Sequence, residues 1–115
     1  MDCLFCKIAA KEIATEIVWE DESIIVFKDI HPRSPVHVLI VPRMHIASVN
    51  EAGTAHEALL GRLFTTARTV ARNLGIADSG YRLIVNTGPD GGQLIGHLHM
   101  HLMGGTKIGP KGEEL

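Results

Sequence analysis

The chain has 115 residues, a formal net charge of −2 with histidine counted as neutral, and 45% hydrophobic residues. This length fits one compact domain, and the apolar content excludes intrinsic disorder. The lack of a basic excess argues against a nucleic-acid-binding protein, and no apolar run of about 18 residues predicts a membrane span. The N-terminus has no basic segment followed by an apolar run, so we expect a cytoplasmic protein.

The first half of the chain predicts short strands. Residues 3–11 mix apolar and polar positions and predict a short helix or turn. Three strands are expected, at residues 16–19, 23–28 and 37–41. The polar turn 20–22 predicts a hairpin between the first two, the two prolines in 31–35 predict a loop, and Pro42 ends the third strand.

One long helix is predicted in the middle of the chain. Between about residues 50 and 74, apolar residues recur three or four positions apart and form one stripe, namely Leu59, Leu63, Ala67, Val70 and Leu74. A capping pattern of Thr54 with Glu57 places the start of the helix near Thr54, and Gly75 follows as its C-terminal cap.

Two more strands are expected after the helix, at residues 81–86 and 97–103, with the glycine-rich turn 87–92 between them. Residues 106–115 predict a polar tail, so a single domain is expected over residues 1–105. Strands, one long helix and strands again predict an α+β fold with a mainly antiparallel five-stranded sheet.

Three histidines alternate in the last predicted strand. Because alternate side chains of a strand share a face, His97, His99 and His101 are expected about 6.6 Å apart on one side. The residues between them, Leu98, Met100 and Leu102, are expected in the core. Burying three imidazoles without partners costs several kcal/mol, which favours a functional site. On spacing alone, the three could supply a nucleophile or hold a catalytic zinc ion.

Two other segments carry candidate chemistry. Cys3 and Cys6 form a Cys-x-x-Cys pair, which in a reducing compartment indicates metal ligands or a redox pair. Gly91, Gly92 and Gln93 combine close backbone approach with an amide side chain, so this turn could place N–H donors around a phosphate.

The segment GQLIGHLHMHLMGG, residues 92–105, resembles the signature of the histidine-triad (HIT) superfamily. Residues 27–30, 35–37 and 41–45 resemble the first half of that family, and Asn86 with the glycine turn resembles the second. The similarity covers nearly the whole chain, and the short length resembles the Hint branch, the nucleoside phosphoramidate hydrolases. The resemblance favours the nucleophile over the catalytic metal.

The resemblance implies that His99 attacks the α-phosphate of a nucleotide conjugate. A covalent nucleotidyl-histidine would form, and water would then release the nucleoside monophosphate. The groups expected to donate hydrogen bonds to the developing negative charge are His101, Gln93 and Asn86. His37 would support the triad, and the backbone carbonyl of His97 would fix the tautomer of His99. No catalytic metal is expected.

The resemblance also implies a nucleotide-binding site, with a purine nucleotide as ligand. Asp29 matches a residue that binds ribose hydroxyls, although its local sequence fits a turn-capping aspartate as well. Gly92 would approach the phosphate. The base pocket is expected from residues that could equally be core, namely Leu4, Phe5, Ile8, Phe27 and Ile30.

Further expectations concern the leaving group, a metal and assembly. Leu94 stands where Hint-like proteins carry a polar residue, so the preference for amine leaving groups stays open. Dinucleoside polyphosphate hydrolysis, nucleotidyl transfer and weakly catalytic nucleotide binding are the alternatives.

Similarity to bacterial members implies a structural zinc ion on Cys3, Cys6, His45 and His97. It also implies a homodimer in which the sheet continues across the two-fold axis.

Overall fold

The computed structural model describes residues 3–109, and these form two helices, five strands and two short 3-10 turns. The helices are α1 (Leu4–Ala9) and α2 (Glu57–Asn73), and the 3-10 turns span Val49–Glu51 and Thr54–His56. The strands are β1 (Ile17–Glu20), β2 (Ile24–Lys28), β3 (Val36–Pro42), β4 (Tyr81–Ile84) and β5 (Met100–Gly104).

The strands form one antiparallel sheet in the order β1-β2-β3-β5-β4. The expected hairpin joins β1 and β2, and β5 lies between β3 and β4. The predicted α+β fold, with a five-stranded antiparallel sheet, one long helix and a short N-terminal helix, is therefore confirmed.

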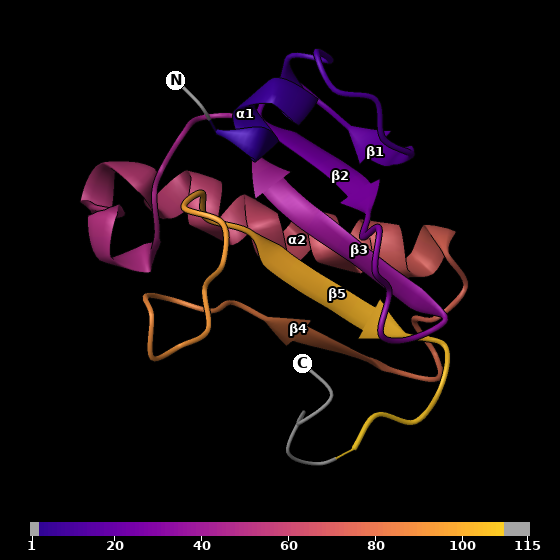
Figure 1. Ribbon diagram of the computed structural model, residues 1–115. Helices are drawn as coiled ribbons and strands as arrows, with labels where there is room; N and C mark the ends of the chain where they lie inside the picture. Colours follow the sequence, from indigo (N-terminus) through magenta and orange to yellow (C-terminus); the bar gives the residue numbers. More distant parts are fainter. Residues whose placement is uncertain (1–2, 110–115) are drawn as a thin grey trace.

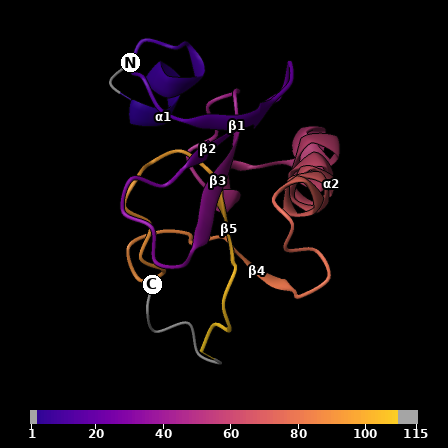
Figure 2. The same cartoon turned by 90° about the vertical axis from the view of Figure 1, so that its right-hand side faces the viewer.

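The two faces of the sheet are covered differently. Helix α2 lies along one face, and α1 lies on the opposite face together with the β2–β3 and β4–β5 loops (Figures 1 and 2). The α2 face carries the larger core, which includes Leu98 just before β5 and Met100 and Leu102 of β5, as expected. A smaller apolar cluster lies beneath α1 and includes Phe5 and Phe27. The α1 face is thus left to build a site.

The long helix begins three residues later than the capping pattern predicts. The ring of His56 accepts a hydrogen bond from the Gly53 N–H over 2.9 Å, and a 3-10 turn fills the interval before Glu57. The predicted stripe does face the sheet, with Leu63 and Val70 almost fully buried. Gly75 follows the helix with φ of +77°, a conformation that favours glycine, as expected for the cap.

The strand expected over residues 97–103 begins only at Met100, and the strand expected over 81–86 ends at Ile84. The His97 N–H donates to the carbonyl of Ile95, and the Leu98 N–H donates to the carbonyl of Ile46. The N–H groups of residues 97 and 98 are therefore paired outside the strand ladder, and the first two triad histidines lie just before the strand.

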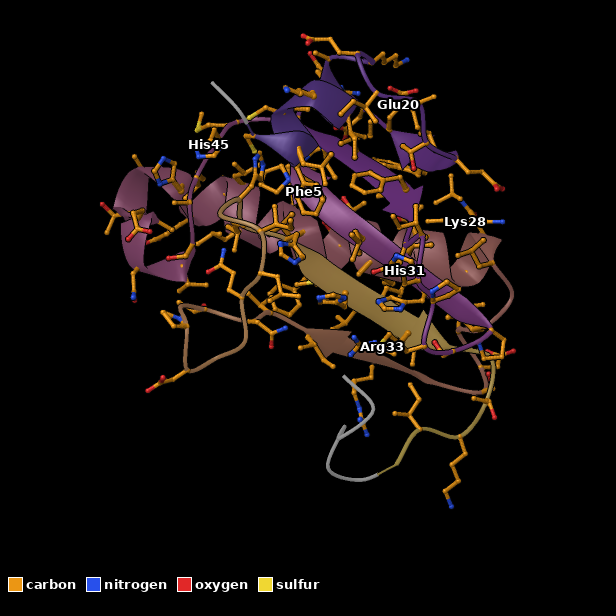
Figure 3. The ribbon with its side chains drawn as sticks, viewed as in Figure 1. Phe5, Glu20, Lys28, His31, Arg33 and His45 are labelled. Carbon is orange, nitrogen blue, oxygen red and sulfur yellow. The ribbon has the colours of Figure 1, made fainter. Side chains whose placement is uncertain are left out.

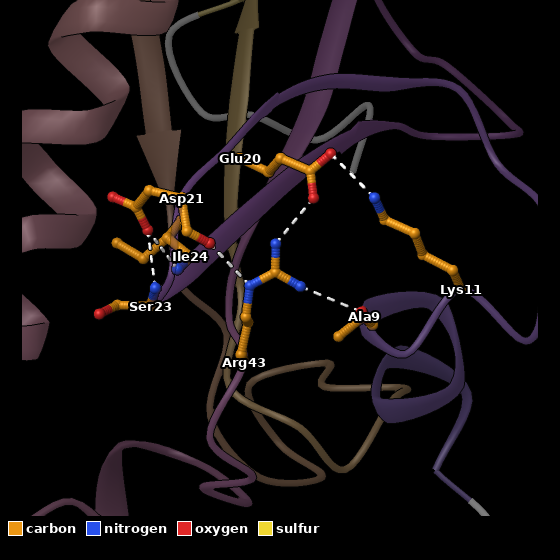
Figure 4. A network of polar contacts seen from close by, with 7 residues as sticks. All are labelled: Ala9, Lys11, Glu20, Asp21, Ser23, Ile24 and Arg43. Atoms are coloured by element: carbon orange, nitrogen blue, oxygen red, sulfur yellow. Dashed lines mark hydrogen bonds and ion pairs between the residues drawn. The ribbon is translucent and has the colours of Figure 1, made fainter.

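Arg43 connects α1 to the β1–β2 turn (Figure 4). Its guanidinium donates to the backbone carbonyls of Ala9 (3.0 Å) and Asp21 (2.8 Å) and pairs with Glu20 (2.8 Å). Lys11 pairs with the same glutamate. Because Ala9 is the last residue of α1, this network fixes the end of that helix.

The ends of the chain add little to this picture. The tail expected over residues 106–115 is described only as far as residue 109, and residues 110–115 lie outside the described part. Among the described residues, neither helix is long and apolar enough to cross a bilayer.

Candidate functional site

The three triad histidines lie on the α1 face, as their alternation predicts. Phe5 packs edge-on against the rings of both His97 and His99, at centroid distances of 5.9 and 5.1 Å. The rings of His99 and His101 are also 5.1 Å apart. Phe5 belongs to α1 and His45 lies near that helix, whereas His31 and Arg33 lie toward the other end of β3 and β5 (Figure 3). The site therefore runs along β5 beneath α1.

His99 is held in one tautomer. Its Nδ1 donates to the backbone carbonyl of His97 over 2.7 Å, because a carbonyl oxygen can only accept. The neutral ring then carries its lone pair on Nε2, which makes no hydrogen bond within residues 3–109. Burial lowers the pKa of His99, against the opposing effect of that hydrogen bond. The arrangement provides an unprotonated imidazole nitrogen near neutral pH.

His101 is oriented by a hydrogen-bond chain that starts at a backbone amide. The Arg33 N–H donates to Nδ1 of His37 over 3.1 Å, so the proton of neutral His37 is on Nε2. This Nε2 lies 2.9 Å from Nδ1 of His101 and donates to it. His101 therefore carries its own proton on Nε2. Burial, followed by the charges of His99 and His37, lowers the pKa of His101 to about 4, so it stays neutral.

Asp29 caps a turn and also faces His37. One carboxylate oxygen accepts the His31 N–H over 2.8 Å, which is the turn-capping arrangement that its local sequence suggests. The other oxygen lies 3.5 Å from Nε2 of His37. Its binding of ribose hydroxyls stays a prediction.

The residues expected to line a base pocket fall into two groups. Phe5, Ile8 and Phe27 are buried beneath α1 and pack with one another. Leu4 and Ile30 are 42% and 80% exposed. Only these last two present substantial apolar surface to solvent, and the base-binding role of the set stays a prediction.

The glycine-rich turn is braced by Gln93. Its carbonyl oxygen accepts the Gly88 N–H, and its amide nitrogen donates to the carbonyls of Ala47 and Ile95, all within 3.0 Å. Both N–H groups of the Gln93 amide are therefore in use. One of these two hydrogen bonds would have to break before Gln93 could donate to a phosphate. Gly91 packs so tightly that an added Cβ would lie 2.3 Å from the carbonyl oxygen of Thr87.

The remaining residues singled out near this turn are more open. Gly92 has φ of +79°, which favours glycine at that position. Asn86 is half-buried and its side chain forms no hydrogen bond within residues 3–109, so its amide is available as a donor. Leu94 is 90% exposed.

The four expected zinc ligands converge at the start of α1. The Nδ1 atom of His97 lies 3.3 Å from Sγ of Cys3, 3.6 Å from Sγ of Cys6 and 3.2 Å from Nδ1 of His45. Sγ of Cys6 lies 3.3 Å from Nδ1 of His45. Zn–S bonds of about 2.3 Å and Zn–N bonds of about 2.0 Å in a tetrahedron separate ligand atoms by roughly 3.3–3.8 Å. These four distances fall close to that range, and all four ligand atoms lie within 4.8 Å of one another, so the four side chains could share one metal ion.

A backbone carbonyl that the sequence does not reveal orients this cluster. Nε2 of His97 donates to the carbonyl of Pro42 over 2.8 Å, which leaves the lone pair of the neutral ring on Nδ1, facing the cysteines. The backbone carbonyl of His97 thus accepts the hydrogen bond from His99, while its ring nitrogen Nδ1 faces the cluster. Pro42 and His97 are 55 positions apart in the sequence, so no local pattern could have indicated this contact.

Comparisons with known proteins place the chain among proteins of known sequence and fold. A HIT domain model matches residues 10–108. The purine nucleoside phosphoramidase of Escherichia coli K12 is 46% identical over 109 residues, covering 95% of this chain and 92% of that protein. A HIT family hydrolase of Legionella pneumophila superposes with a TM-score of 0.94 at 40% identity, covering 96% and 99% of the two chains. One from Clostridium thermocellum gives 0.92 at 49% identity, covering 95% of each.

Proposed function

Because the chain belongs to the HIT domain family, we propose that it is a hydrolase of nucleoside 5′-phosphoramidates that uses His99 as its nucleophile. The observation that carries this proposal is the 2.7 Å bond from Nδ1 of His99 to the carbonyl of His97. It leaves the lone pair of His99 on Nε2 and stabilises the positive charge that the ring acquires when Nε2 forms a bond.

The first step forms a bond between Nε2 of His99 and the α-phosphorus and breaks the phosphorus–nitrogen bond. The amine departs with the bonding electron pair and takes up a proton from water. Negative charge builds on the non-bridging oxygens in this step, so fixed N–H donors accelerate it. His101 offers Nε2–H and Asn86 offers its side-chain amide, while Gln93 holds the glycine turn.

The second step returns the enzyme to its starting state. Water attacks the phosphorus and gives up a proton to the solvent, the bond to His99 breaks with its electron pair returning to Nε2, and the nucleoside monophosphate leaves. Burial lowers the pKa of both His99 and His101, so both rings are neutral at physiological pH. His99 then needs no deprotonation before the next attack.

We propose in addition that Cys3, Cys6, His45 and His97 hold a structural zinc ion. Support comes from the ligand spacing and from the Pro42 carbonyl, which directs the lone pair of His97 to the cluster. When bound, the ion would supply a cross-link between α1 and the segment that precedes β5. His99 is not one of the four ligands, so the ion is compatible with the proposed nucleophile.

We also propose a homodimer that pairs β4 and α2 of two copies. β4 lies at the edge of the sheet, and its outer side has no neighbouring strand among residues 3–109. Phe64 of α2 is 58% exposed, an apolar surface that a partner would cover. Two copies paired in this way would form one continuous sheet.

The proposed reaction is tested by trapping its intermediate. Adenosine 5′-phosphoramidate is mixed with the protein, the reaction is quenched with alkaline denaturant within milliseconds, and the intact mass is measured. We expect the mass of an attached adenylyl group on the unsubstituted protein and none on His99→Asn. Normal turnover by His99→Asn would overturn the assignment, and faster cleavage of a diadenosine polyphosphate would favour that alternative substrate class.

A further inference from the structure

The loop between β2 and β3 is organised around a single side chain, His37. The Asp29 N–H donates to the backbone carbonyl of His37 over 3.1 Å and closes the loop. At the other end of the loop, the Arg33 N–H donates to the His37 ring over 3.1 Å. His37 is only 5% exposed. Backbone groups thus hold both the main chain and the ring of this histidine.

The Asp29 carboxylate completes the arrangement. Its first oxygen is held by the His31 N–H, which fixes the orientation of the side chain. Its second oxygen lies 3.5 Å from Nε2 of His37, the nitrogen that donates to His101. Nearby atoms of Asp29, His37 and His101 lie within 4.8 Å of one another. A negative charge at this position favours the proton on Nε2 of His37 and disfavours the other tautomer.

From this geometry we propose that Asp29 is a positioning residue for His101, acting through His37. The carboxylate and the Arg33 amide together fix the proton of His37 on Nε2, so that His101 accepts at Nδ1 and presents Nε2–H to the phosphate. This role rests on the proposed function and goes beyond the ribose contact expected of Asp29. One carboxylate would then both bind the nucleoside and prepare the donor for its phosphate.

A substrate without ribose hydroxyls separates the two roles. Kinetics are measured for the unsubstituted protein and Asp29→Asn on adenosine 5′-phosphoramidate and on its 2′,3′-dideoxy analogue. Asparagine keeps a carbonyl oxygen for the His31 N–H and removes the charge. We expect kcat on the dideoxy analogue to fall roughly tenfold in Asp29→Asn, because the donor is displaced whether or not ribose is bound. Equal kcat values on that analogue would overturn the proposal.

A double-mutant cycle tests whether Asp29 acts through His37. In a His37→Gln background, Asp29→Asn should cause no further loss of kcat on the dideoxy analogue. Losses that multiply would show that Asp29 acts by another route and would overturn the proposal. Glu22→Gln, which removes one charge from an exposed position in the β1–β2 turn, is the matched control and should leave kinetics unchanged.

A measurement without substrate keeps this inference separate from the proposed function. Side-chain ¹⁵N NMR at neutral pH should show His101 protonated on Nε2 in the unsubstituted protein and in Glu22→Gln, and a mixture of tautomers in Asp29→Asn. An unchanged tautomer in Asp29→Asn would overturn the positioning role. If the protein fails to cleave phosphoramidates, the proposed function fails, but this NMR result still decides the role of Asp29.

Discussion

The ring of Phe5 meets the imidazole of His99 edge to face, with centroids 5.1 Å apart and the two planes at 86°. The same ring contacts Phe27 at 5.4 Å and is only 3% exposed. Helix α1 therefore covers His99, the proposed nucleophile, so its placement matters to the proposed chemistry as well as to the fold.

Removing this ring should affect stability and turnover together. We expect Phe5→Ala to lower the free energy of unfolding by about 3–5 kcal/mol, because it leaves a cavity beneath α1. Phe5→Leu keeps most of the volume and should cost less than about 1.5 kcal/mol. Urea unfolding and kcat would be measured for both. An alanine variant as stable as the leucine variant would contradict close packing at this position.

Acidification should destabilise the protein before its carboxylates titrate. Burial lowers the pKa of His37, and burial with neighbouring histidines lowers that of His101 to about 4. The unfolded state therefore binds more protons than the folded state between about pH 6.5 and pH 4. Stability is complete above about pH 6.5 and is lost as the pH falls, by up to about 1.4 kcal/mol per pH unit for His101, with a contribution of the same sign from His37.

Urea unfolding at pH 7, 6 and 5 measures this slope. In His101→Gln the contribution of that ring is absent, so the curve between pH 6 and 5 should be flatter than for the unsubstituted protein. An identical slope in the variant would show that His101 is not held neutral by the fold.

Chelation should lower the melting temperature without abolishing turnover. A zinc ion bound only by the folded state adds stability by mass action, and its removal frees the start of α1. We expect one zinc per chain by elemental analysis of the purified protein, and none in Cys3→Ser/Cys6→Ser. A chelator should lower the melting temperature of the unsubstituted protein only. Complete loss of activity on chelation would instead indicate a catalytic metal.

Truncating Gln93 should lower the stability of the protein, whereas truncating Asn86 should lower its turnover. Gln93→Ala removes three hydrogen bonds that brace the glycine turn and should destabilise the protein by about 1–3 kcal/mol. Asn86→Ala removes a side chain without such bonds, so stability should change little while kcat falls. The opposite pattern in urea unfolding and kinetics would return the donor role to Gln93.

The proposed dimer should depend on the exposed ring of α2. Phe64→Glu places a charge on an apolar patch and should yield a monomer at micromolar concentration in sedimentation equilibrium. Thr65→Glu, on an exposed neighbouring position of the same helix, is the control and should sediment like the unsubstituted protein. A monomeric unsubstituted protein would refute the dimer itself.

The sequence predicts the elements of this fold well because their patterns are local. The alternation around His99 correctly placed the histidines on one face and Leu98, Met100 and Leu102 in the core. The predicted start of β5 was wrong by three residues, because hydrogen bonds to the carbonyls of Ile95 and Ile46 replace strand pairing there. A residue pattern does not show which backbone partners a segment finds in the folded chain.

The partners of the site residues were harder to predict. The 2.9 Å contact between His37 and His101 joins residues 64 positions apart and arises from the pairing of β3 with β5. The Arg33 amide and the Pro42 carbonyl are backbone groups, whose roles no side-chain pattern encodes. The bonds from the Gln93 amide nitrogen to the carbonyls of Ala47 and Ile95 were not predicted, and its role as a donor to a phosphate stays a prediction.

The arrangement of the histidines also depends on the register in which β5 pairs with β3. Leu39 lies opposite His101, and His37 lies opposite Met103. A shift of one residue would turn His101 toward α2 and bring Leu102 to the α1 side. A preparation in which these strands had shifted by one residue would lack the proposed site, so an assay of turnover would also report whether the chain had folded in this register.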